Sequence, residues 1–141
     1  MTKEVRVRVY SLQKGPDTDG EPIELITDGE YFYKNNKHYV LYEESVEGEK
    51  IRNKNRIKIS QGHMELTKSG AVSVTMVFEE GQKHRTLYHT PYGSITMDID
   101  TKNVQVWETE GAMEMEIAYA LYMEEEFVAD CQIRIGVKNR L

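Results

Sequence analysis

A chain of 141 residues, with 39% hydrophobic and 30% charged residues, is long enough for one domain with its own core and too apolar for a disordered protein. Its net charge of −6 argues against a general nucleic-acid-binding protein, because contacts to phosphates need a basic surface. A single cysteine, Cys131, excludes an internal disulfide and no apolar run is long enough for a membrane span, so we expect one cytoplasmic domain, residues 1–141.

A two-residue hydrophobic period runs through most of the chain and predicts a succession of strands. Each apolar set lies on one face of its strand, because successive side chains point to opposite sides. In chain order the sets are Val5, Val7 and Val9; Met64 and Leu66; Val72, Val74, Met76 and Phe78; Ile95, Met97 and Ile99; Met113, Met115, Ile117, Tyr119 and Leu121; and Phe127, Ala129, Cys131, Ile133, Ile135 and Val137.

Short turn signals separate these runs, because Asn and Gly tolerate the positive φ angles of tight hairpins. Thr90-Pro91-Tyr92-Gly93 suits a type I turn between neighbouring antiparallel strands. Strands recurring at this spacing predict an all-β fold, a single antiparallel meander barrel of about eight to ten strands. The other turns are expected at Asn35-Asn36, Glu47-Gly48, Gln61-Gly62, Ser69-Gly70, Gly81-Gln82, Lys102-Asn103 and Gly111.

The sequence carries no recognised catalytic or metal-binding motif. Its four histidines, at positions 38, 63, 84 and 89, stand in no HExxH-like pattern, and one cysteine cannot complete a thiolate zinc site. No set of nucleophile, base and orienting group is visible either. We therefore predict a protein that is not an enzyme and that has neither a cofactor nor a metal.

A basic stripe is expected on one face of the segment around residue 55. It consists of Lys50, Arg52, Lys54, Arg56 and Lys58, which share one phase of a strand. Such a stripe could bind a polyanion. The acidic total of the protein favours the other interpretation, a solvent-facing surface paired with acidic neighbours.

Polar residues on the apolar phase are the informative exceptions. Lys68 follows Met64 and Leu66 in phase, and Glu44 follows Val40 and Tyr42. In a small barrel both would point inward, where a charge needs a partner, so we predict that they form an ion pair. Such groups line a pocket or plug one end of the barrel, and plugging is the commoner outcome in narrow eight-stranded barrels.

One spaced set of residues forms a recognisable pattern. It consists of Lys68-Ser69-Gly70, Phe78, Tyr88-His89-Thr90-Pro91-Tyr92-Gly93, Thr101, Gly111 and Tyr119, with Tyr42-x-Glu44 upstream. The pattern resembles the YwiB-like family of small bacterial proteins over nearly the whole chain. The resemblance implies a calycin-type antiparallel barrel, similar to lipocalins and streptavidin, with no established biochemical activity.

The leading functional hypothesis is a non-enzymatic cytoplasmic barrel that binds a small molecule in its lumen. The alternative is a protein-interaction or structural module whose barrel is solid. We expect a monomer or a homodimer, with neither nucleic acid nor membrane as partner. The predicted lumen residues are Tyr42, Glu44, Lys68, Tyr88, Thr90, Thr101 and Tyr119.

Overall fold

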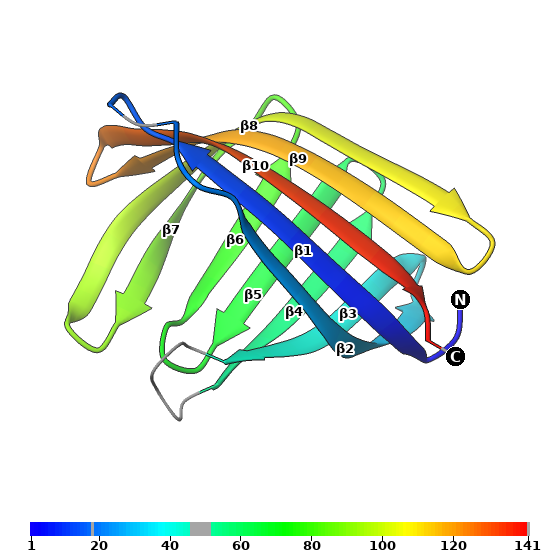
Figure 1. Cartoon of the computed structure of the whole chain (residues 1–141). Helices are drawn as coiled ribbons and strands as arrows, with labels where there is room; N and C mark the ends of the chain where they lie inside the picture. The colour runs from blue at the N-terminus through cyan, green and yellow to red at the C-terminus, as the bar shows by residue number, and fades with distance from the viewer. Residues whose placement is uncertain (18, 46–51, 141) are drawn as a thin grey trace.

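A computed structural model describes residues 1–17, 19–45 and 52–140 and has ten antiparallel strands (Figure 1). In these ranges no helix is long and apolar enough to cross a membrane. The strands are β1 (Glu4–Lys14), β2 (Ile23–Lys34), β3 (Lys37–Ser45), β4 (Arg52–Ser60), β5 (His63–Ser69), β6 (Val74–Glu79), β7 (Lys83–Thr90), β8 (Gly93–Thr109), β9 (Ala112–Met123) and β10 (Glu126–Asn139).

The strands form one sheet that curls into a nearly closed barrel, with the order β6-β5-β4-β3-β2-β1-β10-β9-β8-β7. The first and last strands pair, with Val7 opposite Val137, which brings the two ends of the chain together (Figure 1). The edge strands β6 and β7 follow each other in sequence. Between these edges the structure describes backbone hydrogen bonds only at Ser73 and His89, of 3.0 and 2.9 Å. The barrel therefore has a seam between β6 and β7.

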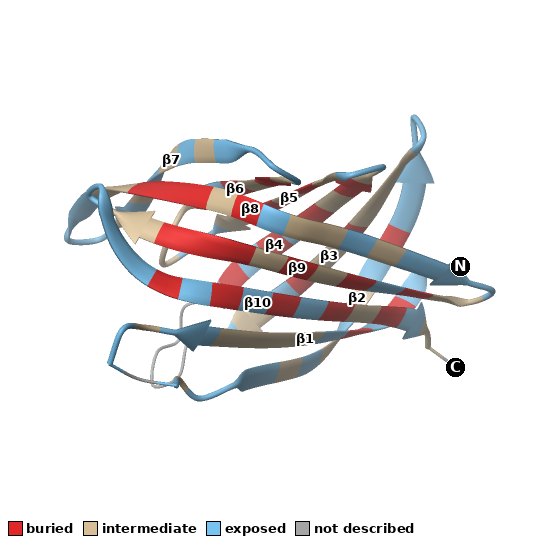
Figure 2. Ribbon diagram, turned by 90° about the horizontal axis from the view of Figure 1, so that it is seen from above, coloured by how far each residue is buried: buried red, intermediate tan, exposed pale blue. Residues whose placement is uncertain are grey.

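The core fills the middle of the barrel. Buried residues alternate with exposed ones along β10, as its stripes show (Figure 2), and mostly with intermediate ones along β9. Burying one large aliphatic or aromatic side chain contributes about 1.5–3 kcal/mol, so this shared interior is the main source of stability. The largest side chains with almost no exposure are Phe78, Ile57, Ile59, Met64, Ile99, Met113, Met115, Ile117, Ile135, Val5, Val7 and Val40.

Most of the expected turns are confirmed. Asn35 and Asn36 have φ angles of 54° and 62°, as a tight hairpin requires. The turn expected at Lys102-Asn103 is wrong, because the strand pairing continues through it and only the register shifts, as in a β-bulge within β8. The turn expected at Glu47-Gly48 lies outside the described residues.

A second bulge corrects the predicted inner face of the last strand. The register of β10 against β9 shifts between Phe127 and Ala129. Phe127 is consequently turned outward, with 42% exposure, and packs against Tyr122 with their ring centroids 5.8 Å apart. The inward series of β10 therefore begins at Ala129 and continues to Val137.

Candidate functional site

An ion pair between two neighbouring hairpins marks the polar end of the barrel. Lys68 Nζ of β5 donates to Glu44 Oε1 of β3 at 2.5 Å, and the two side chains are 24% and 25% exposed. The predicted inward ion pair is thus present, half-buried. Burial alone would raise the pKa of Glu44, but the Lys68 ammonium and the nearby amides of Asn55 and Asn53 outweigh burial and lower it.

Asn53 connects this ion pair to the turn between β5 and β6. Its buried Oδ1 accepts a 2.9 Å hydrogen bond from the backbone N–H of Ala71, and its Nδ2 donates to Glu44 at 3.5 Å. Gly70 lies against the same strand with φ of 145°, where an added Cβ would be 2.5 Å from the Arg52 carbonyl oxygen. Asn53 therefore holds the turn in place and has a structural role.

Asn55 lies on the same inner face but does not bond a turn as Asn53 does. It pairs with Tyr42 of β3 on one side and with Lys68 of β5 on the other, so the three form an inward row, named here the Tyr42–Asn55–Lys68 row. Asn55 is 2% exposed, and its amide is near enough to Glu44 to help lower the pKa of that carboxyl, yet neither Nδ2 nor Oδ1 makes a hydrogen bond of ordinary geometry to a described residue. Nearly all buried polar side chains are hydrogen-bonded, so this amide stands out.

Tyr42 supplies the aromatic part of the row. It is almost fully buried, and burial, together with the charge of Glu44, raises the pKa of its phenol. Its neighbour in β2 is Gly29, where a Cβ would come within 2.7 Å of the Leu41 carbonyl oxygen and 2.8 Å of a Val7 methyl group. A glycine in a strand interior often marks such a close approach.

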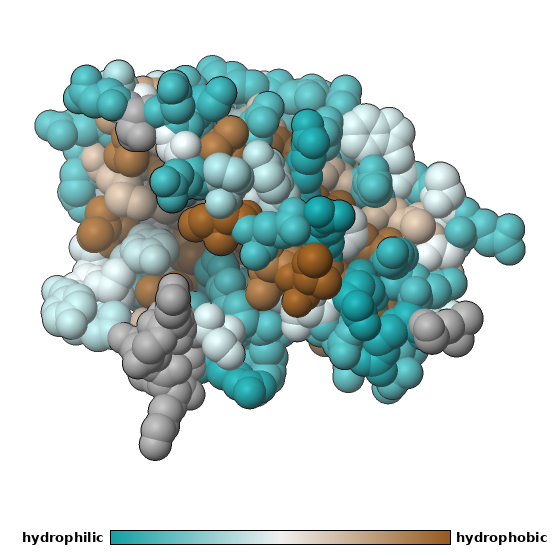
Figure 3. Space-filling model, viewed as in Figure 1, coloured by the Kyte–Doolittle hydropathy of each residue, from teal (hydrophilic) through white to brown (hydrophobic). Residues whose placement is uncertain are grey.

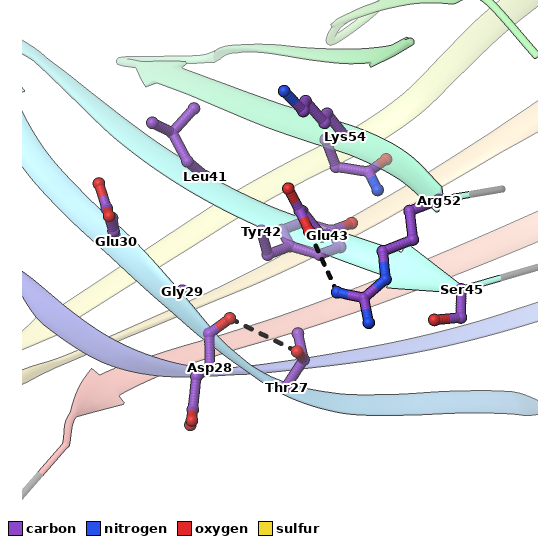
Figure 4. A pocket seen from close by; sticks show the side chains of 11 residues that line it. Thr27, Asp28, Gly29, Glu30, Leu41, Tyr42, Glu43, Ser45, Arg52 and Lys54 are labelled. Carbon is purple, nitrogen blue, oxygen red and sulfur yellow. Dashed lines mark hydrogen bonds and ion pairs between the residues drawn. The ribbon is translucent and has the colours of Figure 1, made fainter. Parts of the chain in front are cut away.

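A pocket of about 650 Å³ opens where β2 and β3 separate beyond the Gly29–Tyr42 pair (Figure 4). Its lining combines outward side chains of β2, β3 and β4 with the inward Tyr42 and Asn55, so the pocket lies in the barrel wall beside the buried row. The lining residues are Thr27, Asp28, Gly29, Glu30, Leu41, Tyr42, Glu43, Ser45, Arg52, Lys54 and Asn55.

The charges at this pocket are nearly balanced. Asp28 is paired outside the pocket with Arg6 at 3.0 Å and with Arg140 at 2.7 Å. Burial tends to raise the pKa of Asp28, but these two arginines lower it. Arg52 contacts Glu43 at 3.5 Å. A dashed line marks this contact in Figure 4. Glu30 and Lys54, which remain, have opposite signs.

The bases on β4 lie on its outer face, and two of them pair with acidic neighbours, as expected for a solvent-facing surface. Arg52 and Lys58 pair with Glu43 and Glu65 of the neighbouring strands, at 3.5 and 3.7 Å. The first member of the expected stripe, Lys50, lies outside the described residues.

The predicted lumen residues do not line one cavity. Tyr42, Glu44 and Lys68 lie together at the polar end. Thr90 belongs to the β7–β8 turn, where its Oγ1 donates to the Gly93 carbonyl at 2.9 Å and accepts from the Tyr92 N–H at 3.1 Å. This confirms the hairpin at residues 90–93 and gives the Thr90 hydroxyl a structural partner.

The other three lie along the interior. Tyr88 on β7 packs against the core and is half-buried. Thr101 and Tyr119 face each other across β8 and β9 and are buried. The ring centroids of Tyr119 and Phe78 are 5.0 Å apart. Burial raises the pKa of the Tyr119 phenol. The Thr101 hydroxyl is a second buried polar group without a partner among the described residues.

Lys68 also borders a second pocket, of about 600 Å³, at the seam between β6 and β7. His89, which lies on this pocket, has Nδ1 2.7 Å from Ser94 Oγ. Both residues are exposed, and in the described part of the chain no carboxylate contacts His89 to orient its ring. Catalytic serine–histidine pairs need such a third group, so this pair has the geometry of a surface contact.

The family relationship is now supported by direct comparison. Residues 7–135 match the model of a domain of unknown function, DUF1934. The chain belongs to this family. The uncharacterized beta-barrel protein YwiB of Bacillus subtilis (strain 168) is 31% identical over 110 residues, which cover 78% of this chain and 76% of that protein.

The fold is shared with a solved relative. The crystal structure of the ywiB protein from Bacillus subtilis matches this family member with a TM-score of 0.86 and 26% identity, over 99% of this chain and 93% of that one. These findings confirm the expected YwiB-like resemblance and the barrel. They give the family no biochemical role.

Sequence reasoning missed both buried asparagines. The signal was present, because Asn53 and Asn55 share the phase of Ile57 and Ile59. The bases at the alternate positions of the same strand are the stronger signal, and they mark its outer face. The residues between these bases form the inner face, and the two asparagines are the polar members of that set.

Proposed function

We propose that this protein is a non-catalytic cytoplasmic barrel that binds a small molecule, which enters between β2 and β3 and ends against the Tyr42–Asn55–Lys68 row. The observation that carries the proposal is the Asn55 amide, buried beside a pocket with neither polar atom paired among the described residues. An unsatisfied buried polar group costs about 1–3 kcal/mol. A bound ligand would offset this cost.

The shape of the site agrees with this role. A pocket of about 650 Å³ is in the range of small-molecule sites, and up-and-down barrels such as lipocalins hold ligands at their mouths. The resemblance to lipocalins is a fold-level analogy, so the proposal rests on the unpaired amide. Because core side chains fill the barrel beyond the row, the ligand is confined to the mouth.

A protein-interaction module with a solid barrel is the second candidate, and the filled core favours it. Protein-binding sites usually have a contiguous hydrophobic centre. On the face seen in Figure 3, hydrophobic side chains show in separate groups between hydrophilic ones. The open pocket at Asn55 is therefore the more distinctive feature of the molecule.

Native mass spectrometry of protein purified without denaturation from its source organism tests the proposal. We expect an added small-molecule mass on the wild type, which is lost in Asn55→Leu and after unfolding and refolding. Thr101→Val is the matched control, because it removes another unpaired buried polar group that lies outside the pocket lining. One bare mass for all three proteins would overturn the proposal, and an added protein subunit would favour the interaction module.

A further inference from the structure

We infer that the ligand presents a neutral carboxamide-like edge, with a hydrogen-bond donor beside an acceptor, to Asn55. This inference rests on the binding role proposed above and names the chemical class that the site takes.

The first argument is the hydrogen-bonding capacity that Asn55 leaves open. Its side chain offers an acceptor oxygen and an N–H₂ donor, and both atoms lack a partner among the described residues. A carboxylate can satisfy only the donor side and would face the amide oxygen with a second acceptor. A carboxamide or the edge of a nucleobase satisfies both sides at once, as asparagine does with adenine.

The second argument is the charge of the surroundings. Next to Asn55, the ammonium of Lys68 is already bound to Glu44. At the rim, Glu43 contacts Arg52, and Asp28 is held by two arginines outside the pocket. A ligand group with a net charge would lose its hydration at Asn55 without meeting a surplus opposite charge, which is costly. The site therefore favours a neutral group.

The third argument is the aromatic neighbour. Tyr42 lies directly opposite Asn55 in the β3–β4 ladder and lines the same pocket. Its ring offers apolar contact area, and its hydroxyl adds a polar group. Gly29, beside Tyr42, lets β2 pack closely against Leu41 and Val7 at the edge of the pocket. A flat ligand that carries its amide edge at one end suits this arrangement.

Four ring compounds that differ in one substituent test this inference: benzamide, benzoate, acetophenone and toluene. Each is titrated into ¹⁵N-labelled, refolded protein and followed by NMR, with the Asn55 side-chain amide signal identified by its loss in Asn55→Leu. We expect benzamide to bind at least about tenfold more tightly than acetophenone or benzoate, as one or two net hydrogen bonds imply. Benzamide should also shift the Asn55 signal.

Variants give the control. Asn55→Leu removes both hydrogen-bonding groups of the side chain, so benzamide binding should weaken about tenfold or more. Thr101→Val should leave it unchanged. Equal binding of toluene and benzamide, preferred binding of benzoate, or no binding of benzamide would each overturn the inferred class. The proposed binding role would then survive only if the native protein still carries an added mass that Asn55→Leu loses.

Discussion

Asn53 and Asn55 lie two residues apart on the inner face of β4, and the amide of Asn53 bonds a turn and a carboxylate while that of Asn55 bonds no described residue. Both are buried, so exposure does not explain the difference. Asn53 faces the chain that returns from β5, whereas Asn55 lines the pocket between β2 and β3. The same residue type thus has a structural task at one position and an open binding capacity at the next.

The two asparagines should respond oppositely to substitution in ligand-free protein. Asn53→Ala should destabilise the fold by about 1–3 kcal/mol, because the Ala71 N–H loses its acceptor. Asn55→Leu should be neutral or stabilise it by about 1 kcal/mol, because an unpaired polar group is removed. Urea unfolding measures both. A loss of more than about 1 kcal/mol in Asn55→Leu would mean that the amide is satisfied in the free protein.

The Glu44–Lys68 ion pair should be strongly coupled. Exposed pairs contribute about 0–1 kcal/mol, and breaking a buried pair costs about 3–5 kcal/mol. For this half-buried pair we expect Lys68→Met and Glu44→Gln each to cost about 1–3 kcal/mol, and the double variant to cost less than their sum. If the unfolding free energies of both single variants lie within about 0.5 kcal/mol of wild type, the ion pair is not buried and does not plug the end of the barrel.

Acid should destabilise the fold partly through Glu44. The pKa of Glu44 is lower in the folded protein than in the unfolded chain. The ionised carboxylate therefore stabilises the fold above the unfolded pKa, and this contribution is lost as the pH falls through the folded pKa. Asp98 acts in the same direction, because the bidentate Arg85 guanidinium lowers its pKa despite burial. Unfolding free energies measured below about pH 4 should therefore fall less steeply in Glu44→Gln than in wild type.

The exposed Glu126 provides the control for this comparison. Glu126→Gln should keep the wild-type slope. Identical slopes in all three proteins would show that the carboxyl of Glu44 has the same pKa in the folded and unfolded states.

Alkali should act through two buried phenols. Burial raises the pKa of Tyr42 and of Tyr119, so both stabilise the fold below pH about 10, and this stabilisation is lost as the pH rises toward their folded values. Ultraviolet titration should show phenols that ionise only when the protein unfolds. Tyr42→Phe and Tyr119→Phe should each remove part of that late step. A titration complete before unfolding would contradict the burial of these rings.

The seam should be the least protected part of the barrel wall. Continuing the Ser73–His89 register would place Thr75 opposite Leu87, yet the structure describes no hydrogen bond between them. The amides of these two residues should exchange with deuterium orders of magnitude faster than those of Ile117 and Ile133, which lie in the interior of the sheet. Equal protection would show that the barrel closes fully in solution.

The sequence predicted the faces of the strands well, because the two-residue period depends only on which side is buried. It placed Val137 and Met113 inward correctly. It misread Lys102-Asn103, because the polarity of these residues resembles that of a turn and a bulge is set by pairing with the next strand.

The site was predictable only in part. Glu44 and Lys68 were found by phase, and their ion pair followed from the cost of an unpaired buried charge. The pocket was not, because it depends on where β2 leaves β3 to follow β1, which the local period does not record. Likewise, phase alone could not show that the Thr90 hydroxyl is bonded within its turn.

A high-resolution crystal structure of protein purified with its native contents tests the central claim most directly, through the density beside Asn55. The proposal predicts a small organic molecule between β2 and β3, with one atom donating to Asn55 Oδ1 and another accepting from Nδ2. Ordered waters alone at these two atoms, or an Asn55 side chain bonded to the protein itself, would contradict it.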